Sequence, residues 1–536
     1  MTRFNSRGTR PAVSSPVATT GERTRTHEGG AGHLRDSRSE LFLLAVANMV
    51  GQDTFYETGG QRDDRYTALV RQLAVEDPAW TAGLLAWLRG PGNMRTASIV
   101  GAAEFAYARL AAAKGDSGLG HQVAIEQQDA GWNRRVIGSV LQRADEPGEL
   151  LAYWTSRYGR AIPKPLKRGI EDALGSLYTE RSLLKYDTAG KGYRFGDVVE
   201  LVHPTPKALW QGDLFGHAID RRHNRDKPIP ESLQLLHTRA AISEWDTDKR
   251  RQLLRRPDAA EFLNHAGMTW EALAGWLQGP MDKEAWEAII PSMGYMALLR
   301  NLRNFDEAGV SDDIAEQVAK RLSDPQEVAR SRQFPFRFLA AYKHAPSLRW
   351  GHALEKALGY SLASVPALPG RTLVLVDRSG SMFGGLSERT QLNRADSAAV
   401  FGTAVAARAE QADLVEFGTT SRLVPLGKGE SVLRVLERFH DLGGTNTTEA
   451  VRAHYRGHDR VLIVTDEQAS YSYYGDPTAQ VPASVPVYTW NLAGYQAGHG
   501  PSGSANRHTF GGLTDAAFRM VPLLEAGRDA SWPWEA

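Results

Sequence analysis

The most informative segment of the chain is Leu373-Val374-Leu375-Val376-Asp377-Arg378-Ser379-Gly380-Ser381-Met382. An apolar run typical of a buried strand ends abruptly in an aspartate, and two serines follow at alternate positions. Such a loop presents one carboxylate and two hydroxyls together. In open parallel sheets, ligands bind beyond the carboxyl ends of the strands. The segment therefore predicts both a parallel-sheet domain and an oxygen-lined site at its edge.

Two later segments supply the remaining parts of such a site in the expected order. They are Gly443-Gly444-Thr445-Asn446-Thr447 and Val461-Leu462-Ile463-Val464-Thr465-Asp466. Hard divalent cations prefer oxygen ligands, and Mg²⁺ keeps several waters in a near-octahedral shell. We therefore predict a divalent cation, most simply Mg²⁺, with one position open for an outside carboxylate or phosphate. The predicted ligands are Asp377, Ser379, Ser381, Thr445 and Asp466.

This assignment has a plainer alternative. Aspartate and serine are common turn residues, so the same side chains could merely cap the ends of strands. The site could also be structural, without an external ligand. We expect Asp466 to bind the cation directly or through water. Glu467 follows it in the sequence, and we predict that its side chain faces away from the site.

Short β-rich segments and a helical pattern surround these motifs. Ala398, Phe401, Ala404 and Val405 fall at helical spacing between two of the strands. Strands and helices that alternate in this way predict a doubly wound parallel sheet. The region 368–536 resembles the von Willebrand factor A domain, whose metal-ion-dependent adhesion site has the three segments quoted above. The predicted strands are Thr372–Val376, Asp413–Phe417, Val461–Thr465 and Val487–Trp490.

The composition is that of an ordinary globular protein. The chain has 536 residues, 42% of them hydrophobic, and a net charge of +1, so no overall basicity points to nucleic acid. The lack of cysteine excludes disulfides, cysteine-bound zinc and thiol catalysis. No apolar run is long enough to span a membrane. We expect residues 1–34 to be a flexible tail without a signal peptide, and the protein to be a cytoplasmic monomer.

The pattern from about Leu41 to Ala363 is helical almost throughout. Asp77-Pro78 is typical of a helix start, and Trp80 and Trp87 follow on one apolar face. A loosely similar unit begins at Thr269-Trp270. Many short helices with weak internal similarity predict an α-solenoid of HEAT-type repeats, with an irregular helical domain as the alternative.

Several blocks in this region are more specific than a generic helix. They are Thr54–Glu57, Asn93–Ser98, Pro163–Arg168, His203–Lys207, Trp286–Pro291, Met296–Leu302 and Phe334–Leu339. The blocks around Met94, His203 and Met296 are the most distinctive. Ahead of an A-type domain, they resemble the TROVE module of the Ro ribonucleoprotein family, as found in its bacterial orthologues, over roughly residues 35–365. With the C-terminal domain, the resemblance covers nearly the whole chain.

The resemblance implies a fold and a function. Ro proteins close a ring of helical repeats with the A domain. They bind small noncoding Y RNAs on a basic outer surface, and they accept single-stranded 3′ ends of misfolded or structured RNA through the central hole. Bacterial members are linked to RNA degradation and ribosomal RNA maturation, partly through tethering of polynucleotide phosphorylase. The chain is accordingly expected to be an RNA-binding scaffold and not an enzyme.

Candidate RNA contacts come partly from spacing. Lys164, Lys167 and Arg168 lie at i, i+3 and i+4, which places three cations on one helix face. Such a face neutralises phosphates with little sequence preference, although it could equally be an ordinary solvated face. Aromatic residues could stack on bases, but at helical spacing they are more often core, and we assign Trp87 and Trp276 to the core.

Other candidates are implied by the resemblance. The family's Y RNA contacts include a Lys-Tyr pair and a histidine ahead of a proline-containing turn, which match Lys185 and His203. Lys191 and Arg194 lie between them, in a stretch one residue longer than is usual in the family. A capping or buried role is the alternative for His203.

Three arginines could line the central hole: Arg95, Arg134 and Arg135. Arginines of this kind equally often pair with carboxylates between helices. Two functions of a different class also remain. One is a Mg²⁺-dependent adhesion-type module that grips an acidic protein partner. The other is a hydrolase that uses the cation, which the mostly hydroxyl ligand set and the lack of an obvious general base disfavour.

Overall fold

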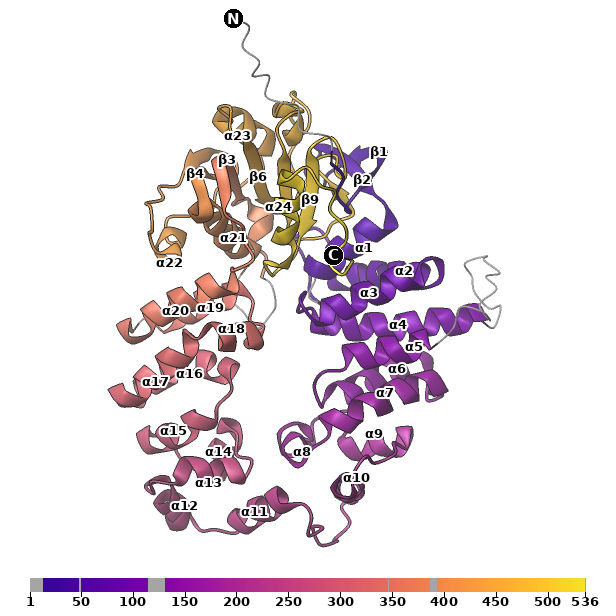
Figure 1. The fold of residues 1–536 in the computed structure, drawn as a ribbon, viewed down its shortest axis with the longest axis vertical. Helices are drawn as coiled ribbons and strands as arrows, with labels where there is room; N and C mark the ends of the chain where they lie inside the picture. Colours follow the sequence, from indigo (N-terminus) through magenta and orange to yellow (C-terminus); the bar gives the residue numbers. More distant parts are fainter. Residues whose placement is uncertain (1–12, 48–49, 114–130, 346, 386–392, 536) are drawn as a thin grey trace, which may run out of the picture.

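The computed structural model describes residues 13–47, 50–113, 131–345, 347–385 and 393–535. The helices follow one another around a ring, and the C-terminal domain lies between the two ends of the helical run (Figure 1). We call α1–α10 the first arm and α12–α20 the second arm, with α11 between them. Within the described ranges, no helix combines the length and the hydropathy needed to cross a membrane.

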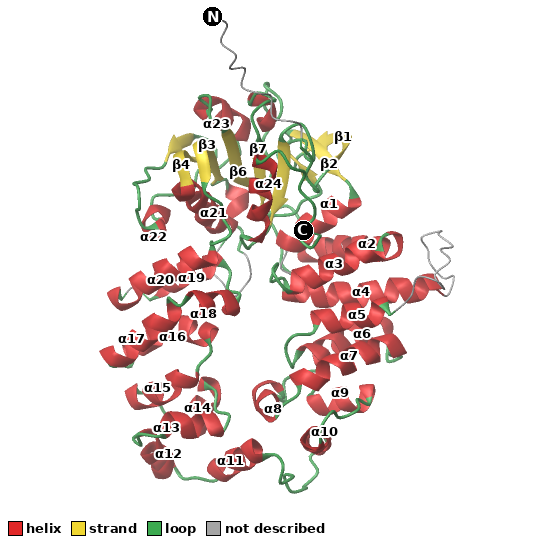
Figure 2. Cartoon of the chain, in the orientation of Figure 1, coloured by secondary structure: helices red, strands yellow, loops and turns green. Residues whose placement is uncertain are grey.

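Short helices dominate both arms (Figure 2). In the first arm they are α1 (Ser37–Ala47), α2 (Gly59–Glu76), α3 (Pro78–Arg89), α4 (Arg95–Ala113), α5 (Trp132–Val140), α6 (Glu146–Tyr158), α7 (Lys164–Leu177), α8 (Glu180–Tyr186), α9 (Phe195–Val202) and α10 (Leu209–Arg222). The remainder are α11 (Gln234–Ser243), α12 (Thr247–Leu254), α13 (Ala259–His265), α14 (Trp270–Leu277), α15 (Lys283–Ile289), η2 (Ile290–Ser292), α16 (Tyr295–Glu307), α17 (Asp312–Leu322), α18 (Pro325–Ser331), α19 (Pro335–His344) and α20 (Leu348–Ser361).

The helix starts follow the expected capping chemistry. The Asp77 carboxylate accepts a hydrogen bond from the backbone N–H of Trp80 at 3.2 Å, and Pro78 occupies the first turn of α3. Trp80 and Trp87 are buried on the apolar face, as predicted. Thr269 caps α14 in the same manner. Neighbouring helices pack in consecutive pairs around the ring, which is the HEAT-type solenoid that the sequence predicts.

The C-terminal domain contains the predicted parallel sheet. Its strand order is β5-β4-β3-β6-β7-β9, and only the β4–β5 pair is antiparallel. The strands are β3 (Leu368–Asp377), β4 (Ala409–Phe417), β5 (Ser421–Leu423), β6 (Arg460–Thr465), β7 (Val487–Asn491) and β9 (Arg507–Gly511). The accompanying helices are η3 (Gly380–Phe383), α21 (Arg394–Arg408), α22 (Val432–Leu436), α23 (Thr447–His454), η4 (Pro477–Gln480), η5 (Ala516–Arg519) and α24 (Met520–Glu525).

All four predicted strands lie within strands of this sheet, whereas β9 was not predicted. β9 reads Arg-His-Thr-Phe-Gly, so it offers no apolar run, yet all of its residues are buried. It pairs with β7 in parallel, with Val487 opposite Arg507. The sheet is the doubly wound, von Willebrand factor A-type arrangement that the sequence predicts.

The prediction of a flexible tail over residues 1–34 is wrong from residue 13 onward; residues 1–12 lie outside the described ranges. Strands β1 (Thr19–Arg25) and β2 (Ala31–Arg35) form a hairpin, and β2 pairs with β8 (Ala497–Gly498) of the C-terminal domain. The hairpin was missed because its sequence is polar, and its pairing partner lies more than 450 residues away.

Charge pairing holds this hairpin to the C-terminal domain. The Arg35 guanidinium binds the Glu467 carboxylate, and both side chains are only 1% exposed. Arg35 also donates to the carbonyl oxygen of Tyr495 at 3.0 Å. Glu467 therefore points away from the predicted metal ligands, as expected, and toward the N-terminal hairpin.

Helix α1 connects the hairpin to the first arm, and beyond its first turn it is buried on every side. Each residue of Leu41–Ala47 is at most 2% exposed. A helix that is apolar all round must lie inside a core. α1 contacts β9 on one side and α2 and α3 on the other. Trp532 and Trp534 from the C-terminus pack against Phe42 and Trp80, with ring centroids 5.2 to 6.1 Å apart.

Replacing Arg35 by alanine should lower the free energy of unfolding by about 3–5 kcal/mol, because it leaves the Glu467 carboxylate buried without its cation. Chemical denaturation measures this loss. Arg25→Ala, at an exposed position of the same hairpin, serves as the matched control and should cost far less. Equal losses in the two variants would show that the hairpin is not anchored by the buried pair.

Candidate nucleic-acid interface and metal site

The predicted metal ligands come from the carboxyl ends of neighbouring strands. β3 and β6 pair in parallel, with Val376 opposite Val464, so the aspartates that end them are neighbours at one edge of the sheet. The Ser381 hydroxyl donates to Asp466 at 2.7 Å, and Ser379 Oγ lies 3.3 Å from Ser381 Oγ. The structure thus brings Asp377, Ser379, Ser381 and Asp466 together.

Thr445 comes from the predicted segment 443–447. The carbonyl oxygen of Gly443 accepts a hydrogen bond from the backbone N–H of Gly380 at 2.5 Å, which places the two loops against each other. Thr445 is 2% exposed. Sequence reasoning did not identify Thr465, whose hydroxyl donates to the second oxygen of Asp377 at 2.6 Å. As the last residue of β6, it resembles an ordinary strand residue.

The electrostatics of this cluster suit a cation. Asp377 and Asp466 are both fully buried, and neither has an ion-pair partner in the described part of the chain. Burial first, and the charge of Asp377 second, raise the pKa of Asp466 to about 7. Burial likewise raises the pKa of Asp377. Two adjacent buried carboxylates beside serine and threonine hydroxyls fit a divalent cation, because it would neutralise both.

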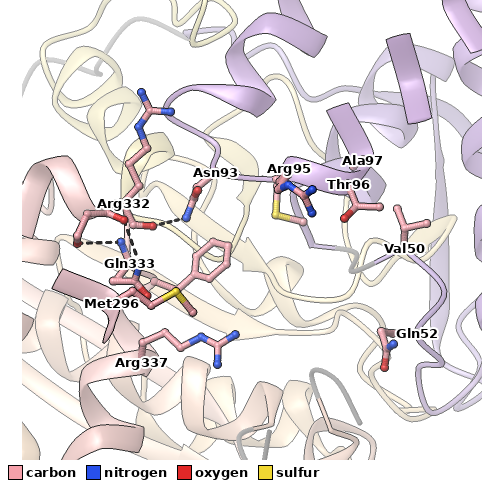
Figure 3. A pocket seen from close by; sticks show the side chains of 13 residues that line it. Val50, Gln52, Asn93, Arg95, Thr96, Ala97, Met296, Arg332, Gln333 and Arg337 are labelled. Carbon is pink, nitrogen blue, oxygen red and sulfur yellow. Dashed lines mark hydrogen bonds between the residues drawn. The ribbon is translucent and has the colours of Figure 1, made fainter. Parts of the chain in front are cut away.

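A cavity of about 340 Å³ lies where the two arms approach each other (Figure 3). Asn93–Ala97 line it from the first arm, and Met296 and Ser331–Phe334 line it from the second. Two of the most distinctive sequence blocks, those around Met94 and Met296, therefore share one cavity. The Asn93 side chain donates to the carbonyl oxygen of Arg332, so a direct hydrogen bond joins the arms here.

Arg95 lines this cavity, but its guanidinium is already neutralised. It donates to Glu146 at 2.9 Å and also binds Glu149, with Asp145 at 3.8 Å. The alternative interpretation, an arginine paired with carboxylates between helices, therefore describes this residue. Arg95 shapes the wall of the cavity and brings little free positive charge to it.

Arg337 is the cation that sequence reasoning missed. It lines the same cavity (Figure 3). Burial, and then the charge of Arg300, lower its pKa. Within the described ranges, neither Arg300 nor Arg337 has a carboxylate at ion-pair distance. The signal was present, because Arg337 stands in the Phe334–Leu339 block, where apolar residues lie on both sides of it.

The three cations at the start of α7 remain together on the surface. Lys164 and Arg168 are exposed, and Lys167 is half-buried. α7 packs closely against α5 and α9. The turn that follows α9 also reaches α7, because the backbone N–H of Thr205 donates to Glu171 at 3.0 Å. The helix face predicted from i, i+3 and i+4 spacing is thus accessible to solvent.

Lys185 and His203 are both accessible. The Lys185 ammonium lies 5.1 Å from the centre of the Tyr186 ring. His203 ends α9 in the left-handed conformation, with φ 54°, and its side chain is exposed. The capping alternative is therefore true of its backbone and leaves its ring available. Figure 1 shows α8, which carries Lys185, on the side of the first arm that faces the middle of the ring.

The remaining candidates are engaged in ion pairs or ring contacts. Lys191 lies 3.2 Å from both Asp145 and Glu149, and Arg194 pairs with Asp187 at 2.7 Å. Arg134 forms a bidentate salt bridge with Asp172, and the Arg135 guanidinium lies over the Trp132 ring. Neither Arg134 nor Arg135 is among the residues that line the cavity between the arms.

Comparison with known proteins agrees with this architecture. The TROVE domain family matches residues 229–349, from just before α11 to the start of α20. A stretch of 117 residues is 35% identical to telomerase protein component 1 of Rattus norvegicus and of Mus musculus. That stretch is 21% of this chain but only 4% of the length of those relatives.

The crystal structure of the Deinococcus radiodurans Ro (RSR) protein is similar to both the helical ring and the C-terminal domain of this chain. It superimposes with a TM-score of 0.60 and covers 90% of this chain and 100% of its own, at 16% sequence identity. Residues 229–349 thus match the TROVE domain family, and the chain combines helical repeats in a ring with a von Willebrand factor A-type domain. Its fold is that of the Ro (RSR) protein, and the match of residues 229–349 agrees with the predicted resemblance of the helical region to the TROVE module.

Proposed function

We propose that the protein is the RNA-binding scaffold of a small ribonucleoprotein. The observation that carries this proposal is Arg337, which lines the cavity between the arms and lies close enough to Arg300 for that charge to lower its pKa. Two guanidinium groups near each other repel unless an anion lies between them. A phosphate group is the anion that arginine forks recognise best, because its oxygens accept several hydrogen bonds at once.

The cavity offers more than charge. Asn93 and Gln333 supply amide groups, while Met94 and Phe334 supply apolar surface, as stacked or unpaired bases require. A cavity of about 340 Å³ holds a nucleotide-sized group rather than a duplex. We infer that it receives a single-stranded segment, such as the 3′ end of a misfolded or structured RNA.

A second RNA surface is proposed on α7–α9. It comprises Lys164, Lys167, Arg168, Lys185 and His203, and it suits the backbone of a folded, Y-like small RNA. The family resemblance supports this assignment, and it also suggests an exoribonuclease such as polynucleotide phosphorylase as a further partner. The scaffold would then bring structured RNA, a free 3′ end and a nuclease together for RNA quality control or ribosomal RNA maturation.

The two surfaces should be separable by mutation. Arg337→Ala should weaken binding of a single-stranded oligoribonucleotide and lower the slope of log K against log salt by about 1, because one phosphate contact is lost. It should leave a blunt-ended RNA hairpin unaffected. The double variant Lys185→Ala/His203→Ala should weaken binding of the RNA hairpin and leave binding of the single-stranded oligoribonucleotide unaffected. Gel-shift titrations at several salt concentrations, with folding checked by circular dichroism, measure both.

Arg256→Ala is the matched control, because Arg256 is an exposed arginine between α12 and α13, paired with Asp258 and outside both surfaces. It should change neither affinity. If Arg337→Ala and the double variant weakened the two RNAs equally, one undivided surface would be binding both. If neither variant differed from Arg256→Ala, these residues would not be RNA contacts.

We also propose that Asp377, Ser379, Ser381 and Asp466 hold a divalent cation, with Thr445 nearby. The buried pair of carboxylates supports this proposal, because without a cation it is a costly arrangement. Such a cation supplies a Lewis-acidic position that an oxygen ligand can occupy. The cation would stabilise the loops at this edge of the sheet, and the alternative function, a Mg²⁺-dependent grip on an acidic partner, depends on the same site.

Mg²⁺ binding measured by calorimetry should weaken as pH falls through about 7. Asp466 has a raised pKa, so it is protonated below that pH, and a proton must leave before the metal can bind. Asp377→Ala should abolish the heat of binding. Undiminished Mg²⁺ uptake by Asp377→Ala, or an affinity independent of pH between 5 and 8, would contradict the assignment.

A further inference from the structure

The tip of the N-terminal hairpin lies on the loop that follows the metal-site aspartate Asp466. The Thr26 hydroxyl donates to the carbonyl oxygen of Ala469 at 2.7 Å, and the backbone N–H of His27 donates to Gln468 Oε1 at 2.9 Å. Gly30 makes this approach possible, because a Cβ there would lie 2.3 Å from the carbonyl oxygen of Ala469. The tip residues His27 and Glu28 are thereby held at the edge of the site.

Tyr56 links this tip to the predicted ligands. Its ring stacks on the His27 ring, with centroids 4.7 Å apart and planes within 4°. Its hydroxyl donates a hydrogen bond to the Glu28 carboxylate. Burial first, then this hydrogen bond and the charge of Asp466, raise the pKa of Tyr56, while Ser381, close to the hydroxyl, lowers it. The Glu28 carboxylate is therefore separated from Ser381 by a single hydroxyl group.

In an adhesion-type site, the bound cation accepts a carboxylate from a partner protein, and the Glu28 carboxylate could take that role here. A cation held by two aspartates and several hydroxyls keeps one position for an outside carboxylate. Here the Tyr56 hydroxyl binds a carboxylate of the same chain, that of Glu28, and Ser381 of the predicted site also acts on this hydroxyl. The loop that carries Glu28 is anchored on both sides, by Thr26 on one side and by a bridge between Gly29 and Ser470 on the other.

We propose that Glu28 is an intramolecular ligand of the metal site and fills the position that would otherwise bind an acidic partner. This inference rests on the proposed cation site. The Tyr56 hydroxyl orients the Glu28 carboxylate through their hydrogen bond. The cation thus joins the N-terminal hairpin to the carboxyl edge of the parallel sheet, and an external carboxylate enters only when Glu28 leaves.

Mn²⁺ is the probe for the test, because electron paramagnetic resonance in ¹⁷O-enriched water counts the waters bound to it. In Glu28→Gln the affinity for Mn²⁺ should fall about 10- to 100-fold, the range typical when a group that tunes a metal site is removed. In Glu28→Ala, the number of bound waters should rise by one relative to the unaltered protein, because a water takes the place of the carboxylate.

Glu22→Gln is the matched control, since Glu22 is an exposed carboxylate on β1 of the same hairpin and carries the same charge. It should change neither quantity. Unchanged affinity in Glu28→Gln would overturn the proposal. Lowered affinity with an unchanged water count in Glu28→Ala would also overturn it, because Glu28 would then act only through its charge.

Asp377→Ala distinguishes failure of this inference from failure of the metal site. If the unaltered protein binds Mn²⁺ and Asp377→Ala does not, the site is established, and the Glu28 variants decide the rest. If the unaltered protein binds no Mn²⁺ that depends on Asp377, the cation site itself is wrong and the ligand role of Glu28 falls with it.

Discussion

The ring depends on contacts between the C-terminal domain and both ends of the helical run. At the first end, α1 lies buried between β9 and the helices α2 and α3. Gly494 permits this contact, because a Cβ there would lie 2.6 Å from the carbonyl oxygen of Leu43. At the second end, Glu355 of α20 accepts hydrogen bonds from Ser431 and Val432. A solenoid alone would remain open; the parallel-sheet domain closes it because it is held on both sides.

Much of this architecture was predictable from local patterns. The strand pattern before Asp377 and the capping signal at Asp77 predict their elements correctly, because both depend on residues that are near in sequence. The N-terminal hairpin and β9 were not predictable in the same way. Their sequences are polar, and they become strands by pairing with β8 and β7. Pairing over such separations leaves no periodic signal in either partner.

In the candidate sites, too, features that depend on local sequence were predicted, and features that depend on distant partners were not. Motif spacing predicted that Asp377, Ser381 and Asp466 lie together, because neighbouring parallel strands end at one edge of the sheet. By contrast, Arg95 was proposed for the hole but is neutralised by Glu146, and Arg337 was overlooked within an aromatic block. A sequence lists the cations of a chain but not their partners. Which arginine remains available for phosphate depends on helices that meet only in the fold.

The central claim is that this scaffold carries RNA. The most direct test is crosslinking of the protein in its own cells, followed by sequencing of the RNA that copurifies with it. The account predicts a discrete small structured RNA, together with heterogeneous fragments whose crosslinks map near free 3′ ends. Recovery of no RNA above a mock purification would contradict the account and would leave the metal site, with a protein partner, as the basis of function.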